Sequence, residues 1–191
     1  MAGIEPISEQ NLEDVLPLIR RYQEFYRVAD IEENRNRSFF SQFGKQSEKG
    51  CLFGYRAEGK LVAFATVYFS FSSTIAAKVA IMNDLYTEPT HRQQGIGRLL
   101  IEHCEAFGRK KGAVRLQWVT ARDKEKAQSL YRSLGARQSS WEHFLYTATM
   151  AIALGAAFAR RYFQSAKGIR RLNKTAGATM MGTGGCLALH N

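Results

Sequence analysis

The segment that runs from Asp84 to Leu100 restricts the fold of this chain more than any other. It starts at the end of a run rich in β-branched and apolar residues, 76–85, which predicts a buried strand. After a short turn it passes through Gly95 and Gly97 into a stretch whose apolar residues recur at helical spacing. The start of a helix presents backbone N–H groups without partners, and glycine lacks the Cβ atom that would keep an anion at a distance. The segment therefore predicts a phosphate or pyrophosphate site between a strand and a helix.

The spacing of this loop distinguishes it from two common phosphate-binding loops. A Walker loop requires Gly-Lys-Ser/Thr after four spacer residues, and the segment has no such sequence. A dinucleotide-binding loop requires a third glycine, but that position is Leu100. The chain instead has Arg92-x-x-Gly95-x-Gly97. An ordinary glycine-rich turn before a helix can have the same sequence, so the loop alone leaves that alternative open.

A second motif, A-Q-S-L-Y-R-S-L-G-A, occupies residues 127–136 on another predicted helix. This motif and the loop that begins at Arg92 resemble, in order and separation, the two signatures of the GCN5-related N-acetyltransferase (GNAT) family. The resemblance covers about residues 4–147. The segments around Trp118 and Trp141 look closest to the histone and polyamine acetyltransferase-like branch of that family.

The hydrophobic pattern of the whole chain supplies strands and helices around these motifs. It predicts helices over 9–26, 31–43, 96–111 and 123–134, and strands over 4–6, 51–57, 61–71, 76–85, 113–120, 136–139 and 141–147. Glu58 and Gly59 are expected to form a turn, and Asp123 can cap the last helix. The expected fold class is α/β, with a mixed, mostly antiparallel central sheet flanked by helices, as the resemblance also implies.

The distribution of charge separates a domain from a tail. The chain has 27 basic and 17 acidic side chains, a net charge of +10, but residues 148–191 hold six of the basic ones and no acidic one. Residues 1–147 therefore carry only +4, which an anionic cofactor explains, and nucleic-acid binding is not expected of them. We expect 1–147 to form the N-acetyltransferase domain. The basic tail is expected to contain a short amphipathic helix and then disorder.

Several other features exclude whole classes of protein. No segment reaches the roughly 18 apolar residues of a membrane span, and the N-terminus lacks the pattern of a secretory signal. The three cysteines and four histidines have neither metal-binding nor disulfide spacing. We therefore expect a cytoplasmic protein without a metal site.

The resemblance implies that acetyl-CoA is the co-substrate and assigns it a site. The backbone of residues 85–87 would bind the pantetheine arm like an added strand. The N–H groups at the helix start would hold the pyrophosphate, and the side chain of Arg92 would anchor the loop or contact the phosphates. The implied cofactor-binding residues are Leu85, Tyr86, Thr87, Arg92, Gln93, Gln94, Gly95, Ile96, Gly97, Arg98 and Tyr131.

Acetyl transfer to an amine requires a base and an acid. Only about one lysine-like amine in 10³ is neutral at pH 7, so a base must remove a proton, and the departing thiolate must receive one. Asp84 is the candidate base, although it can instead cap or pair structurally. Relatives often place an acid there or one residue earlier, where this chain has Asn83. Tyr131 is the candidate acid, and its alternative role is that of a core aromatic residue.

The acceptor site is expected between the first two helices and the final strands. Glu24, Tyr26 and Glu32 are the candidate acceptor-binding residues, because carboxylates beside aromatic rings suit a cationic amine. The same residues are equally compatible with a solvated helix face. The acceptor is left open between a polyamine, another small amine, an antibiotic amine and a protein lysine, and a homodimer is also left open. Two further alternatives are a catalytically silent acyl-CoA-binding regulator and a nucleic-acid-associated protein that uses the tail.

Overall fold

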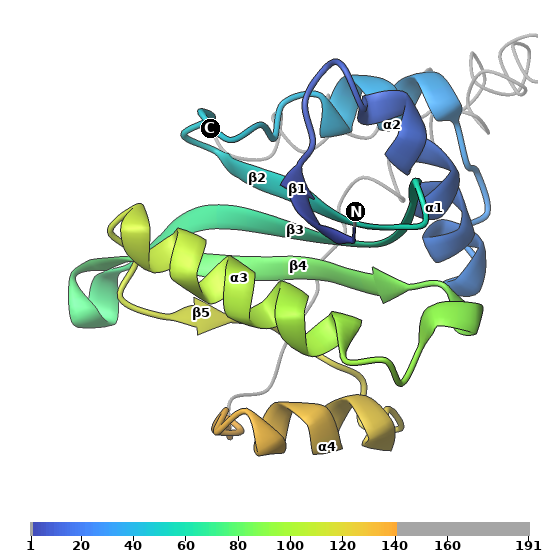
Figure 1. Ribbon diagram of the computed structural model, residues 1–191. Coiled ribbons are helices and arrows are strands. Elements are labelled where there is room, and N and C mark those ends of the chain that lie inside the picture. The colour runs from blue at the N-terminus through green and yellow to red at the C-terminus, as the bar shows by residue number, and fades with distance from the viewer. Residues whose placement is uncertain (1, 141–191) are drawn as a thin grey trace, which may run out of the picture. The chain divides into compact units, whose positions relative to one another are not determined.

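The computed structural model describes residues 2–140 of the 191-residue chain (Figure 1). The chain divides into two compact units, Met1–Arg137 and Gln138–Asn191, and every helix and strand named below belongs to the first. The strand expected over 141–147 and the tail with its amphipathic helix lie outside the described residues.

A single sheet forms the centre of the first unit. Within the described residues its strands are β1 (Gly3–Pro6), β2 (Gly50–Ala57), β3 (Lys60–Ser72), β4 (Ala77–Thr87) and β5 (Leu116–Gln117). Their order in space is their order in the sequence. The first four strands pair antiparallel, whereas β5 pairs parallel to β4. The structure therefore confirms the mixed, mostly antiparallel sheet.

Helices cover both faces of this sheet because successive strand residues point to opposite sides. One core contains α1 (Leu12–Phe25) and α2 (Glu33–Phe40) packed on Phe64 of β3. The other contains α3 (Ile96–Lys110) packed on the next β3 residue, Ala65. Figure 1 shows α3 crossing in front of the sheet. No helix in the described part is long and apolar enough to cross a membrane.

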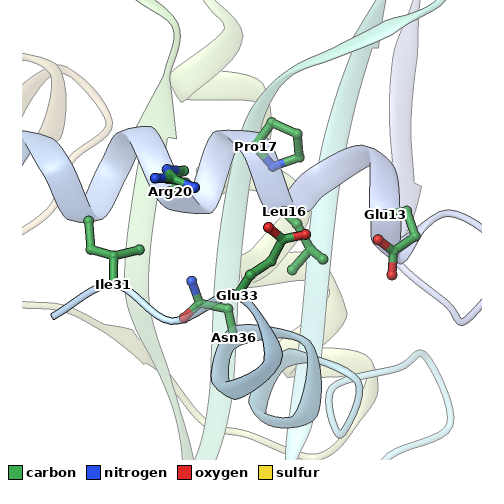
Figure 2. Close-up of a pocket in the computed structure, with 7 residues that line it drawn as sticks. All are labelled: Glu13, Leu16, Pro17, Arg20, Ile31, Glu33 and Asn36. Carbon is green, nitrogen blue, oxygen red and sulfur yellow. The ribbon is translucent and has the colours of Figure 1, made fainter.

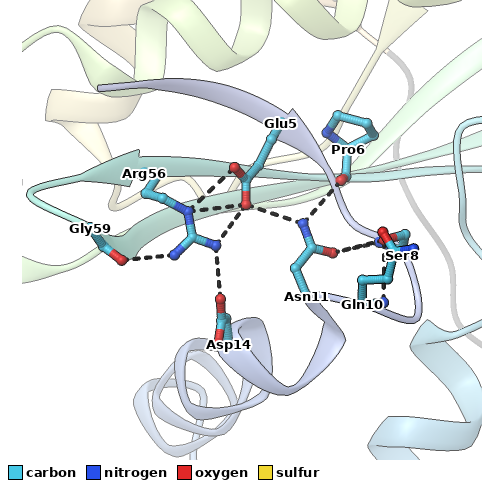
Figure 3. Close-up of polar contacts among 8 residues, drawn as sticks. All are labelled: Glu5, Pro6, Ser8, Gln10, Asn11, Asp14, Arg56 and Gly59. Carbon is cyan, nitrogen blue, oxygen red and sulfur yellow. Dashed lines mark hydrogen bonds and ion pairs between the residues drawn. The ribbon is translucent and has the colours of Figure 1, made fainter. Parts of the chain in front are cut away.

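A polar network ties β1 and β2 to the start of α1 (Figure 3). The guanidinium of Arg56 on β2 contacts Glu5 on β1 at 2.7 Å and Asp14 on α1 at 2.8 Å, and it donates to the Gly59 carbonyl at 2.8 Å. Asn11 adds a hydrogen bond to Glu5 at 3.1 Å. Hydrogen bonding from Arg56 lowers the pKa of Glu5 below its ordinary value. One side chain thus fixes the position of α1 relative to the sheet edge.

Three local predictions on the C-terminal side were wrong. The strand expected over 113–120 is only β5, because β5 pairs with Ala80 and Ile81 alone. Residues 136–139 form no strand, and no described segment pairs with them. The last helix, α4 (Glu125–Ser133), begins after Lys124 rather than at Asp123, and no side chain caps it.

Candidate active site

An irregularity in β4 shapes the candidate site. Thr66 pairs with Asp84, but the next β3 residue, Val67, pairs with Met82, so Asn83 is an extra residue without a partner in the ladder. Such a bulge bends its strand. It also shifts the alternation of the strand by one residue, so that even-numbered residues direct their backbone groups to one side of β4 before the bulge and odd-numbered residues do so after it. Before the bulge, the N–H of Ala80 bonds toward β5, to the Arg115 carbonyl at 2.9 Å. Beyond Ile81, β5 no longer follows β4.

The end of β4 therefore has a free edge within the described residues. The N–H of Glu88 bonds to the Val62 carbonyl of the β3 side at 2.9 Å. Because hydrogen-bonded and non-bonded pairs alternate in an antiparallel ladder, Leu85 and Thr87 direct their backbone groups away from β3. The Thr87 carbonyl accepts a bond from Arg92 Nε at 2.9 Å. The remaining groups can bind an extended, amide-containing chain as an added strand.

The loop after β4 leads from this edge to the start of α3. Its backbone has positive φ at Gln93 (62°) and at Gly95 (80°), the residue that precedes the helix. The N–H of Leu99 bonds to the Gly95 carbonyl at 3.1 Å, so the N–H groups of 96–98 have no helical partner. A Cβ added at Gly95 would meet no atom within 4 Å, so the approach is open. The loop thus leaves backbone N–H groups that an anion such as a phosphate group can approach.

Two cations flank the ring of Phe25 at the end of α1. The Lys124 ammonium lies 4.7 Å from the ring centroid, and the Arg92 guanidinium lies 5.9 Å from it. Lys124 is half-buried. Arg92 therefore anchors the loop through Thr87, and Lys124 packs on an aromatic ring beside the start of α4. Arg98 also connects helices, since it donates to the Ser133 hydroxyl of α4 at 2.8 Å.

Asp84 lies on the sheet face that α1 covers. Its side chain is buried, with 8% of the residue exposed, and the Asn83 amide donates to its Oδ1 at 3.2 Å. Its strand partner Thr66 is fully buried, and the Thr66 hydroxyl has no hydrogen-bond partner among the residues that the structure describes. The raised pKa of Tyr22 on α1 and of Tyr68 on β3 results first from burial and then from the charge of Asp84. The carboxylate is thus buried on a sheet face that also carries the side chains of Thr66 and Tyr68 and against which Tyr22 packs.

Tyr131 lies on the inner side of α4. Its ring is half-buried and contacts Trp118 with 5.1 Å between the ring centroids. Burial raises the pKa of Tyr131, a hydrogen bond with Thr120 lowers it, and the neighbouring Tyr26 raises it. A phenol in this setting keeps its proton at neutral pH and can supply it to a stronger base. Trp118, which sequence reasoning did not place in the site, holds the ring.

The candidate acceptor residues lie on the surface at the ends of α1 and α2. Tyr26 is 56% exposed, and Glu24 pairs with Arg20 at 3.2 Å. Glu32 is exposed and immediately precedes α2. Figure 2 shows a pocket of about 210 Å³ between the same helices, but it includes none of these three residues. It is lined by Glu13, Leu16, Pro17, Arg20, Ile31, Glu33 and Asn36.

Sequence reasoning did not identify several residues around these candidates. The sequence placed Tyr22 on the apolar face of a helix near the expected acceptor site, and Thr66 in a strand, but it related neither residue to Asp84. Only the tertiary structure brings them to Asp84, and no local motif signals that contact. In the described range, no three His, Cys, Asp or Glu residues are placed to hold a metal ion.

Comparisons with known proteins agree with this arrangement. A family model described as the acetyltransferase (GNAT) family matches residues 15–136. The thialysine N-epsilon-acetyltransferase of Bos taurus is 28% identical over 144 residues, which cover 70% of this chain and 83% of that protein. A D-amino-acid N-acetyltransferase of Saccharomyces cerevisiae is 30% identical over 131 residues, which cover 68% of this chain and 79% of that protein.

Solved structures share the fold. The crystal structure of a probable acetyltransferase has a TM-score of 0.68 and 27% identity, with 77% of this chain and 98% of that chain covered. An aminoglycoside acetyltransferase from an uncultured soil metagenomic sample, in complex with sisomicin, has a TM-score of 0.65 and 21% identity, with 78% and 97% covered. The second likeness concerns the fold alone.

Proposed function

Because the chain belongs to the acetyltransferase (GNAT) family, we propose that Asp84 and Tyr131 serve as base and acid in acetyl transfer to a small primary amine. The chain is an N-acetyltransferase that uses acetyl-CoA as its co-substrate. One observation supports this assignment: the free edge of β4 leads directly into the loop before the open helix start at Gly95. Asp84 is buried beside the bulge in the same strand.

Acetyl-CoA supplies an activated acetyl thioester, and the protein supplies its placement. The outward backbone groups of Leu85 and Thr87 bind the amides of the pantetheine arm. The N–H groups at the start of α3 hold the pyrophosphate, where the positive end of the helix dipole favours negative charge. Arg92 keeps the loop attached to Thr87, and Lys124 adds a second positive charge near the ring of Phe25.

The proton transfers follow from the two titratable groups. Asp84, directly or through one water molecule, removes a proton from the acceptor ammonium so that its nitrogen can attack the thioester carbonyl. A C–N bond forms, the C–S bond breaks, and the nitrogen loses its second proton to solvent, to which Asp84 also releases the first. Tyr131 donates its hydroxyl proton to the departing sulfur and recovers a proton from solvent. Each group needs a fixed position, which burial and the contact with Trp118 provide.

The acceptor is proposed to be an amino-acid-like amine rather than a protein lysine. The supporting relatives act, by their names, on thialysine and on D-amino acids, and this chain covers most of their length. The acceptor is proposed to lie among Glu24, Tyr26 and Glu32. Of these three residues, the exposed Tyr26 is the one that influences the candidate acid Tyr131, whose pKa it raises. A cytoplasmic location is also proposed, which agrees with free, buried thiols at two of the cysteines.

The experiment is the measurement of released CoA with a thiol reagent over a panel of amines. The panel contains thialysine, a D-amino acid, spermidine, an aminoglycoside and a histone-tail peptide. We expect kcat/KM to be highest for the first two. Fastest release with the peptide would contradict the acceptor class, and binding of acetyl-CoA without release for any amine would contradict the catalytic roles.

A further inference from the structure

Tyr22 on α1 lies directly over the strand pair that carries Asp84. Its ring centroid is 5.5 Å from that of Phe64 on β3 and 6.0 Å from that of Tyr86 on β4. Phe64 and Tyr86 are partners in the ladder, and the next pair on the same face is Thr66 with Asp84. The phenol therefore lies on the same sheet face as the carboxylate, on the helix side. Burial first, and then the charge and hydrogen-bonding capacity of Asp84, raise the pKa of Tyr22.

Few other groups can stabilise the Asp84 carboxylate. The Asn83 amide donates from the bulge at 3.2 Å, whereas the Thr66 hydroxyl is buried without a partner among the described residues. Tyr68 faces Asp84 from β3, but it interacts through charge alone. The titratable groups that face Asp84 are thus Tyr22 from α1 and Tyr68 from β3, with Tyr86 two residues along β4.

We infer that Tyr22 is the positioning residue of Asp84: its hydroxyl donates to the carboxylate and fixes the orientation in which the base meets the acceptor. The inference rests on the base role assigned to Asp84 under Proposed function. It adds a residue that does not touch the co-substrate and acts only through Asp84.

The test compares Tyr22→Phe with Tyr68→Phe in the full chain. Both substitutions remove one half-buried phenol on the same sheet face, but only Tyr22 is inferred to donate to Asp84. Two quantities are measured: kcat and KM for the amine and for acetyl-CoA, and the NMR chemical shift of the Asp84 carboxyl carbon without substrate. In Tyr22→Phe we expect kcat to fall and the carboxyl chemical shift to change, with KM for acetyl-CoA unaltered. In Tyr68→Phe we expect a smaller change in both quantities.

The same two substitutions in an Asp84→Asn background distinguish the positioning role of Tyr22 from the base role of Asp84. If Tyr22 acts through Asp84, Tyr22→Phe has little further effect on kcat once the carboxylate is gone. An unchanged Asp84 carboxyl chemical shift in folded Tyr22→Phe would overturn the positioning role whatever the activity. A changed chemical shift together with full activity of Asp84→Asn would instead support the contact with Tyr22 and refute the base role of Asp84. Melting temperatures of all variants identify any loss of fold.

Discussion

Replacement of Gly97 by glutamate is expected to stabilise the fold and to abolish binding of acetyl-CoA. Gly97 is the second residue of α3, and a Cβ atom there would meet only a Leu130 methyl at 3.5 Å, an ordinary contact. Replacing a glycine inside a helix by another residue stabilises the folded state by about 0.5–1 kcal/mol. A carboxylate in the first turn gains about 0.3–1 kcal/mol from the helix dipole. Their sum, about 1–2 kcal/mol, raises the melting temperature by roughly 2–8 °C for a chain of this length.

The effect on the co-substrate has the opposite sign. The introduced side chain occupies the approach to the N–H groups of residues 96–98, and each hydrogen bond to a charged group is worth about 1.5–3 kcal/mol. Repulsion between a carboxylate and a phosphate about 4 Å apart adds up to about 4 kcal/mol at a protein surface. Since about 1.4 kcal/mol corresponds to a tenfold change, we expect the Kd for acetyl-CoA to rise by at least about 10³-fold.

The assay combines calorimetric titration with acetyl-CoA and thermal denaturation without ligand. Gly97→Gln is the matched control, because it has the same size without the charge. Its Kd should rise less, and the difference between the two variants should shrink as salt screens the repulsion. A Gly97→Glu protein that melts higher yet binds acetyl-CoA normally would refute the assignment of the phosphate to this helix start.

Three further predictions concern single side chains. Tyr131→Phe keeps the ring on Trp118 and removes only the proton, so turnover should fall on the order of 10²–10⁴ with acetyl-CoA affinity unchanged; unaltered turnover would leave Tyr131 a packing residue. Thr66→Val replaces a buried hydroxyl, which has no partner within residues 2–140, by a methyl group. Denaturant titration should show equal or higher stability, by about 1 kcal/mol at most, and a clear loss would mean that the hydroxyl has a partner. Because the pKa of Glu5 is lowered in the folded state, its ionised carboxylate stabilises the fold above the ordinary carboxyl pKa, and this stabilisation is lost as pH falls through the lowered pKa. Glu5→Gln should therefore reduce the melting temperature at neutral pH. In acid, the melting temperatures of the variant and of the native chain should converge.

The order of elements and the position of the loop could be predicted because both depend on neighbours in the sequence. The periodic apolar residues determined α1, α3 and the three long strands, and Gly95 marked the helix start. The family resemblance, the fold and the use of acetyl-CoA are confirmed. The roles of the individual site residues remain predictions.

The bulge at Asn83 could not be predicted, and it has the largest consequences. A strand with one extra residue has the same local composition as a regular strand, so the pattern over 76–85 gives no signal of it. The bulge nevertheless ends the pairing with β5 and turns Leu85 and Thr87 toward the free edge. The short length of β5 has the same cause, because a strand exists only as far as its partner follows it.

The C-terminal turn of α1 links the separate parts of the site. Tyr22, Phe25 and Tyr26 are three and four residues apart, so they occupy one face of the helix. Asp84 contributes to the raised pKa of Tyr22, and Tyr26 contributes to that of the candidate acid Tyr131. The ring of Phe25 lies near the cations of Arg92 and Lys124. The rings of Tyr22 and Tyr26 contact each other, with 4.9 Å between their centroids. A small rotation of α1 is therefore expected to displace the candidate base, the loop at Arg92 and the candidate acid together.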